Sequence, residues 1–257
     1  MARSEAMATT RNRNARRRPA PPPPSAGANR RLTVVLIAAG ALAAILIVAS
    51  MAGSRGGGST PPPSSIASSG WLSGIPQQGI GLGRPDAPVT LVVYADPQCP
   101  YCAEWERTAL RPLVDKYVRT GKMRIEYRGI PIVGPESVQG LRYFAAAAAQ
   151  NRMWNVLTAS YAAQGAENSG WITPALFRAI GANVPGLDVS RMLSDAGSAT
   201  VTQQLQATQQ QATQDGVHGT PSFLVGRTGG NLRAVSVDAL TADALEPAIN
   251  QALAQPS

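Results

Sequence analysis

The stretch APVTLVVYADPQCPYC, Ala87 to Cys102, joins an apolar segment to the only two cysteines of the 257-residue chain. Its first ten residues, Ala87 to Asp96, are rich in β-branched side chains, which predicts a strand buried on both faces. Pro100 follows Cys99 directly, and proline is favoured at the first position of a helix, where no N–H is needed. The sequence therefore predicts a strand, a tight turn and a helix whose N-cap is Cys99.

The spacing of Cys99 and Cys102 fits redox chemistry better than a structural role. A disulfide across so short a loop stabilises a fold by only about 2 kcal/mol on the chain-entropy model and ties no distant elements together. Structural zinc is the other alternative, but it normally takes four ligands, and the chain has one histidine, His218, besides the two cysteines. At the N-cap, unpaired N–H groups and the helix dipole favour a thiolate. We therefore expect Cys99 to be the nucleophile and Cys102, one turn inward, the resolving thiol.

The segments on the C-terminal side continue an α/β pattern. Helical periodicity runs from Pro100 to Gly121, which is placed as a C-cap, and Met123 to Val133 alternates like a second strand. Ala- and Gln-rich helical segments fill about residues 136–215, and SFLVG and LRAVSV then form a predicted hairpin. A last helix is expected over ADALEPAINQALAQ. This order predicts an α/β fold with a helical subdomain inserted after the second strand.

A second motif, GVHGTPSFLV from Gly216 to Val225, places Thr220 and Pro221 directly before a predicted strand. Together with CPYC and the helical insert, this motif resembles the DsbA-like group of extracytoplasmic thiol-disulfide oxidoreductases in the thioredoxin superfamily. The resemblance covers about residues 79–254 and implies a thioredoxin fold. It also implies that the Thr220–Pro221 bond is cis and that this loop lies beside Cys99, where it offers backbone groups to an extended substrate.

The chain departs from the family pattern at two positions. An acidic residue often stands in the buried strand six positions before the first cysteine, but this chain has Val93 there. DsbA-like oxidases commonly have histidine before the second cysteine, but here Pro100 and Tyr101 separate the cysteines and are expected to tune the redox potential. Because tyrosine adds no positive charge beside the thiolate, we expect a potential between about −120 mV, the DsbA value, and the glutaredoxin range near −200 mV.

Other residues near the motifs have simpler interpretations. Asp96 and Glu104 could act on protons, but a charge at a helix start is usually a solvated partner of the helix dipole. His218 could tune the Cys99 thiolate, but a solvent-facing loop histidine is the favoured interpretation. A serine or cysteine hydrolase needs a histidine as its general base, and the chain has only one histidine, so this class of enzyme is not favoured. The aromatic residues of the insert are expected in its core: Tyr143, Phe144, Trp154 and Trp171.

The net charge of +8 is concentrated at the N-terminus, where residues 1–31 contain eight arginines and one glutamate. Leu32 to Ala52 is an uncharged stretch of 21 residues, and at 1.5 Å per residue it can cross a hydrocarbon core of about 30 Å. We therefore predict a single transmembrane helix over 32–52, with a cleaved signal peptide as the alternative. The arginines then place a disordered basic tail, 1–31, in the cytoplasm and the rest of the chain outside.

A Gly-, Ser- and Pro-rich linker over 53–78 is predicted to hold the catalytic domain, 79–254, away from the membrane. The resulting prediction is an anchored enzyme that forms disulfides in exported proteins, needs no metal or diffusible cofactor, and is reset by a membrane redox partner. Nucleic-acid binding is not expected, because the basic tail has no interleaved aromatic residues. A reductase or isomerase of the same fold, or a non-enzymatic anchored binding or chaperone module, stays open as an alternative.

Overall fold

The computed structural model describes residues 69–256. The predicted tail and transmembrane helix, and the predicted linker up to residue 68, lie outside these residues. Across 69–256, none of the helices has both the length and the apolar character that crossing a bilayer requires.

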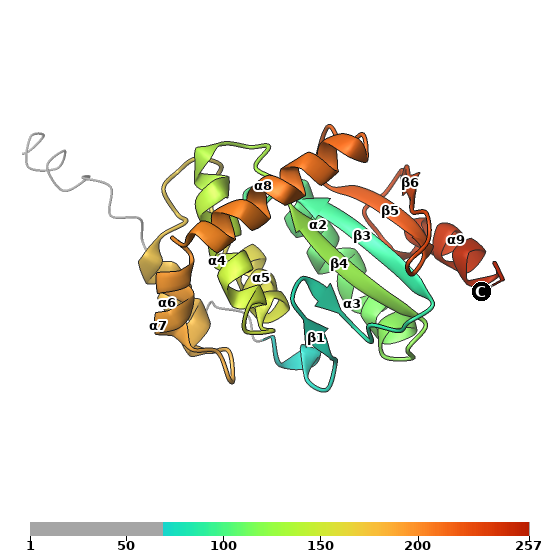
Figure 1. The fold of residues 1–257 in the computed structure, drawn as a ribbon, viewed down its shortest axis with the longest axis horizontal. Helices are drawn as coiled ribbons and strands as arrows, with labels where there is room; N and C mark the ends of the chain where they lie inside the picture. The colour runs from blue at the N-terminus through green and yellow to red at the C-terminus, as the bar shows by residue number, and fades with distance from the viewer. Residues whose placement is uncertain (1–68, 257) are drawn as a thin grey trace, which may run out of the picture. The chain divides into compact units, whose positions relative to one another are not determined.

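A six-stranded mixed sheet in the order β1-β2-β4-β3-β5-β6 forms the centre of the described fold (Figure 1). β3 (Val89–Ala95) is buried along its whole length, as its apolar sequence predicted, and pairs in parallel with β4 (Met123–Gly129). On the other side of β3, β5 (Ser222–Arg227) is antiparallel to it, and β6 (Arg233–Val235) completes the predicted hairpin. The cysteine motif therefore follows the central, most buried strand.

The folded part begins before Gly79, the start expected from the sequence. A 3₁₀ turn, η2 (Gly70–Leu72), buries Leu72, and β1 (Gln77–Gln78) and β2 (Gly81–Leu82) form a short antiparallel hairpin beside β4. Strands of two residues are too short to show an alternating pattern. Residues 70–78 consequently resembled the linker in sequence, although they contain η2 and the edge strand β1.

One continuous helical segment connects β3 to β4 and completes the predicted βαβ unit. It consists of α2 (Pro100–Trp105), a π-helical turn η3 (Glu106–Leu110), α3 (Arg111–Leu113) and a second π-helical turn η4 (Val114–Val118). Pro112 lies between the two wide turns, and its missing N–H removes one i→i−4 hydrogen bond from the helix. The segment ends ahead of Gly121, whose φ of 72° is the left-handed conformation predicted for its C-cap.

The helical insert lies between β4 and β5. It contains α4 (Pro135–Ala148), α5 (Met153–Ala162), α6 (Pro174–Ala182), α7 (Val189–Asp195) and α8 (Ala199–Gln214). In Figure 1 the first four gather beside the sheet, and α8 runs across the end of β3. The remaining helix, α9 (Ala242–Leu253), lies near β5.

Apolar side chains fill both faces of the sheet. The larger cluster contains Leu91 and Val93 of β3 together with side chains from α2, α4, α5, α6 and α9, and the smaller one joins Val92 and Tyr94 to Ala212 of α8. Of the aromatic residues predicted to be core, Trp171 is partly buried and three are buried: Tyr143, Phe144 and Trp154. The core therefore covers both faces of β3, and this packing holds the start of the cysteine motif in place.

Candidate active site

The two cysteines lie at the first turn of the helix that follows β3. Cys99 is the N-cap of α2, Pro100 and Tyr101 take the first two helical positions, and Cys102 takes the third, as the sequence predicted. Both cysteines are free thiols, and their residues are 5% and 1% exposed, respectively. Tyr101 between them is 62% exposed. Cys102 is thus the more deeply buried thiol, and the tyrosine ring stands in solvent beside the pair.

The Thr220–Pro221 loop lies directly against Cys99. The Cys99 thiol donates a hydrogen bond to the carbonyl oxygen of Thr220, with 3.4 Å between Sγ and O, and the Thr220–Pro221 peptide bond is cis. Sheet register explains the meeting: Tyr94 near the end of β3 pairs with Ser222 at the start of β5. The residues after β3 and those before β5 therefore meet at one end of the sheet, which confirms the placement that the resemblance implied.

The surroundings of Cys99 stabilise its thiolate. A hydrogen bond from the Cys102 thiol is the largest cause that lowers the pKa of Cys99, from 9.0 to about 6. The Thr220 side chain and the backbone N–H groups of Cys102 and Tyr101 lower it further, while burial acts in the opposite direction. The N–H contribution is the one expected for an N-cap sulfur.

Cys102 has the opposite character. Burial raises the pKa of Cys102 well above its ordinary value of 9.0, and the hydrogen bond to Cys99 together with the negative charge of that sulfur raises it further. One sulfur of the pair is therefore ionised near neutral pH while the other keeps its proton. This division matches the expected roles of a nucleophilic and a resolving thiol.

Asp96 has a structural role at the end of β3. Its carboxylate is fully buried and accepts four hydrogen bonds, from the backbone N–H groups of Gln98 (2.7 Å), Ile132 (2.7 Å) and Val133 (2.8 Å) and from the Ser137 hydroxyl (2.7 Å). These bonds fasten the segment before Cys99 to the loop between β4 and α4. Because its oxygens already accept these four hydrogen bonds, Asp96 is better explained as a structural hydrogen-bond acceptor than as a proton carrier.

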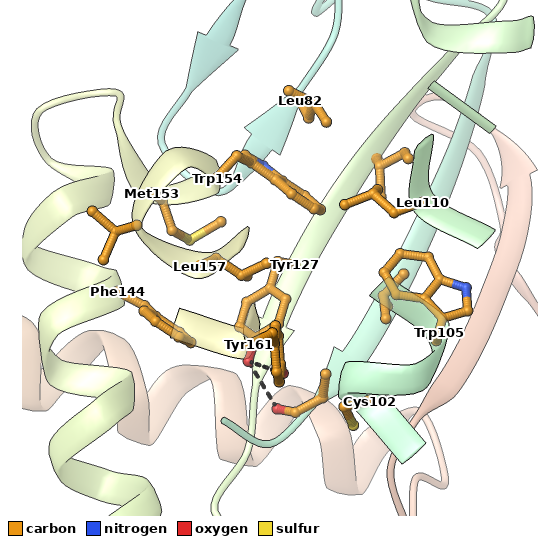
Figure 2. Packing of buried hydrophobic residues seen from close by; sticks show 14 of the residues in the cluster. Leu82, Cys102, Trp105, Leu110, Tyr127, Phe144, Met153, Trp154, Leu157 and Tyr161 are labelled. Carbon is orange, nitrogen blue, oxygen red and sulfur yellow. Dashed lines mark hydrogen bonds between the residues drawn. The ribbon is translucent and has the colours of Figure 1, made fainter. Parts of the chain in front are cut away.

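Two buried tyrosines support the same segment from α5 and β4. The Tyr161 hydroxyl donates to the backbone oxygen of Asp96 at 3.0 Å, and the Tyr127 hydroxyl lies 3.2 Å from that of Tyr161. Figure 2 shows the two rings meeting in the core, with Cys102 at the start of α2. Burial raises the pKa of both tyrosines well above the ordinary value of 10.0, so they stay neutral hydrogen-bond donors.

The remaining candidates from the sequence are exposed or apolar, whereas one buried acid went unnoticed. Glu104 and His218 are exposed, and Val93 is fully buried. Glu106 is 7% exposed, and burial raises its pKa to about 7, opposed by the nearby Thr158 hydroxyl and the charge of Arg107. The signal that could have revealed Glu106 is its i, i+4 spacing from the buried Cys102, which places both on one face of the helix.

The fold and the site together place a dithiol at a helix N-terminus against a cis-proline loop at the end of a mixed sheet, which is the arrangement that the resemblance to the thioredoxin superfamily implied. Within residues 69–256 there is no cluster of three or more His, Cys, Asp or Glu side chains that could hold a metal ion.

The chain belongs to the thioredoxin family, whose family model matches residues 76–249. It is 29% identical over 162 residues to the probable disulfide bond formation protein D of Bacillus anthracis, an alignment covering 62% of this chain and 73% of the relative. A solved thioredoxin-like oxidoreductase from Silicibacter pomeroyi DSS-3 is 27% identical with a TM-score of 0.55, covering 74% of this chain and 100% of that one. Oxidised BdbD from Bacillus subtilis shares the fold with a TM-score of 0.61 at 16% identity, covering 70% and 98%.

The family model and the named relative show that the protein is a thiol-disulfide oxidoreductase and therefore an enzyme. Its fold is also that of DsbA, as in alpha-DsbA1 of Wolbachia pipientis, with a TM-score of 0.58 at 16% identity, covering 68% of this chain and 90% of that one. The non-enzymatic binding module, open at the level of sequence, is no longer supported.

Proposed function

We propose that the protein is a membrane-anchored, extracytoplasmic oxidase that donates the Cys99–Cys102 disulfide to exported proteins. The observation that carries this proposal is the contrast between the two thiols: the pKa of Cys99 is lowered to about 6, while that of Cys102 is raised well above 9.0. A stabilised Cys99 thiolate favours the reduced dithiol form of the enzyme over the disulfide form, so the disulfide is readily transferred to a substrate that has two thiols. The name of the Bacillus anthracis relative, a disulfide bond formation protein, supports the same direction.

Donation consists of two exchanges that move two electrons from the substrate to the enzyme. A substrate thiolate attacks the sulfur of Cys99, the Cys99–Cys102 bond breaks, and Cys102 leaves with the electron pair and takes up a proton. The second substrate thiolate then attacks the substrate sulfur of the mixed disulfide and releases Cys99 as a thiolate. The low pKa of Cys99 makes it a good leaving group in this second exchange. The disulfide itself carries the electrons, so no diffusible cofactor takes part.

The substrate is proposed to bind as an extended peptide along the Thr220–Pro221 turn. The Thr220 carbonyl lies beside the Cys99 sulfur, which brings a peptide bound there close to the reacting atom. Tyr101 and Ile132 are large apolar side chains with 62% and 47% of their surface exposed, and they offer contacts for apolar residues of the substrate.

Anchoring and location rest on the sequence. The uncharged stretch Leu32–Ala52 and the eight arginines before it support a single membrane span with the N-terminus in the cytoplasm. The catalytic domain then faces an oxidising compartment, where disulfides persist. A membrane redox partner that accepts two electrons would restore the disulfide after each turnover.

Reduction or isomerisation is the second candidate. Two residues favour it: Tyr101 stands where the strongest oxidases have histidine, and Thr220 before the cis-proline resembles the isomerases and reductases of the superfamily more than its strongest oxidases.

The direction is tested by mixing the oxidised full-length protein, without other oxidant, with a reduced peptide that contains two cysteines. We expect close to one peptide disulfide per protein molecule and a matching gain of two protein thiols, measured by mass spectrometry after acid quenching. The control starts from reduced protein and oxidised peptide, which should stay largely unchanged. Opening of the peptide disulfide in the control, with no oxidation in the first reaction, would support a reductase instead.

A further inference from the structure

The loop between α5 and α6, residues 163–173, lies against the segment that leads into Cys99. Four hydrogen bonds join Gln164 and Asn168 of this loop to Pro97, Gln98 and Cys99, which are 65 to 70 positions away in the sequence. Thr220, which also contacts Cys99, belongs to a separate loop. The helical insert thus has a direct connection to the nucleophilic cysteine that neither the catalytic motif nor the cis-proline turn provides.

Gln164 makes the two bonds closest to the sulfur. Its side-chain amide donates to the backbone oxygen of Pro97 at 2.9 Å and to that of Cys99 at 3.1 Å. The Cys99 oxygen also accepts the first backbone bonds of the helix, from Cys102 N–H at 3.1 Å and Ala103 N–H at 3.2 Å. Gln164 is therefore a third donor to the carbonyl that sets the direction of the first turn of α2.

Asn168 fixes the loop itself. Its backbone N–H donates to the side-chain oxygen of Gln98 at 2.8 Å, and the Gln98 amide donates back to the Asn168 side-chain oxygen at 3.3 Å and to the Ser137 hydroxyl at 3.0 Å. Asn168 has a φ of 52°, a left-handed conformation that asparagine tolerates better than most residues. Gln98 is almost fully buried. The reciprocal amide pair thus holds the loop in the position from which Gln164 reaches Cys99.

The position of the first turn matters for the chemistry of the sulfur. Backbone N–H groups of Tyr101 and Cys102 lower the pKa of Cys99. Whether these groups point at the Cys99 sulfur depends on the orientation of the Cys99 peptide. The carbonyl oxygens of Pro97 and Cys99 carry partial negative charge close to the thiolate, and a donor hydrogen bonded to them reduces this repulsion. Both effects make the thiolate easier to form.

We infer that Gln164 is a positioning residue for Cys99: its two hydrogen bonds hold the first turn of α2 in the arrangement that stabilises the thiolate. The helical insert then contributes to the reactivity of the thiol pair and is more than a cover for the sheet. This inference rests on the proposed role of Cys99 as the nucleophile.

The test is the pH dependence of alkylation of reduced full-length protein by iodoacetamide. Loss of the two hydrogen bonds makes the Cys99 thiolate harder to form, so the pH profile of alkylation moves to higher pH. With Gln164→Ala we therefore expect the rate of Cys99 alkylation at pH 6, expressed as a fraction of the same protein's rate at pH 9, to fall about two- to fivefold. The thiol is ionised at pH 9 in both proteins, so this ratio cancels the somewhat greater nucleophilicity of a more basic thiolate. A mere change in access to the sulfur would alter the rate by the same factor at both values.

Two further variants sharpen the test. Gln164→Glu keeps the size of the side chain but replaces the amide donor by a carboxylate, so it should slow alkylation at pH 6 more than Gln164→Ala does. The matched control is Gln150→Glu: the Gln150 amide also bonds to backbone, with Asp188 O at 3.0 Å and Asp188 N at 2.8 Å, but elsewhere in the insert. The control should alkylate like the wild type at every pH.

Unchanged alkylation profiles in both Gln164 variants would overturn the inference, as would a loss of equal size at pH 6 and pH 9. Thermal unfolding of the reduced variants shows that each is folded at the assay temperature. Peptide oxidation by the wild type distinguishes a failure of the proposed function from a failure of this inference. If the wild type does not oxidise the peptide, the proposed function is wrong. If it does, and the alkylation profiles of the Gln164 variants are unchanged, only the positioning role of Gln164 is wrong.

Discussion

Replacing Cys99 with serine is expected to reduce peptide oxidation by at least about a thousandfold, because a hydroxyl forms no disulfide and the covalent route is lost. Cys102 cannot take over the reaction. It is 1% exposed, and burial raises its pKa well above 9.0, so it provides almost no thiolate at neutral pH. The reaction is followed by acid quenching and mass spectrometry of the two-cysteine peptide.

The matched variant is Cys102→Ser, which keeps the nucleophile and removes the resolving thiol. With a single-cysteine peptide activated by a thionitrobenzoate leaving group, it should form a stable mixed disulfide through Cys99, visible as the summed mass of protein and peptide. Cys99→Ser should form none. An adduct on Cys102 in the Cys99→Ser protein, formed at a similar rate, would reverse the assignment of the two roles.

The second large effect is the selectivity of alkylation in the reduced wild-type protein. At pH 6 about half of Cys99 is thiolate, given its pKa of about 6, against at most about one part in a thousand of Cys102. The thiolate of Cys102 is the more basic one and is therefore intrinsically more nucleophilic, which reduces the difference in rate by a factor of about twenty. We therefore expect Cys99 to react at least about twenty times faster than Cys102, with the burial of Cys102 increasing the ratio further.

The pH dependence has a definite sign. Because the pKa of Cys99 is lowered, its rate should about double between pH 6 and pH 9, whereas the rate of Cys102 should rise about tenfold per pH unit over the same range. Fragmentation mass spectrometry of the peptide containing both cysteines separates the two products. Equal rates at pH 6 would mean that the environment of α2 does not distinguish the thiols.

Local sequence signals were enough to predict the centre of the fold. The apolar run Ala87–Asp96 contains β3 (Val89–Ala95), which is buried along its whole length, and Pro100 at the first helical position makes Cys99 the N-cap. These features depend on neighbouring residues, so a short stretch determines them. The contact between Cys99 and Thr220 spans 121 positions, and only the family resemblance indicated it.

The groups around the thiols were much harder to predict. Glu106 belongs to a charged helical segment that favours an exposed side chain, and only its spacing from Cys102 indicates otherwise. In the structure it lies near Thr158 of α5 and is buried. Gln164 and Asn168 belong to a long helical insert with many polar residues, where nothing in the pattern distinguishes a glutamine that reaches the active site. Tertiary packing determines the contacts of Gln164 and Asn168, and the spacing of residues along the chain does not reveal them.

The reduction potential of the Cys99–Cys102 pair tests the central claim most directly. The full-length protein is equilibrated with glutathione buffers of known ratio, and the fraction of disulfide is measured after acid quenching and alkylation. The stabilised thiolate and the neutral Tyr101 predict a value between about −120 and −200 mV, which favours donation of the disulfide. A value near −270 mV, where thioredoxin lies, would contradict the account, because the disulfide would then be too stable to be donated.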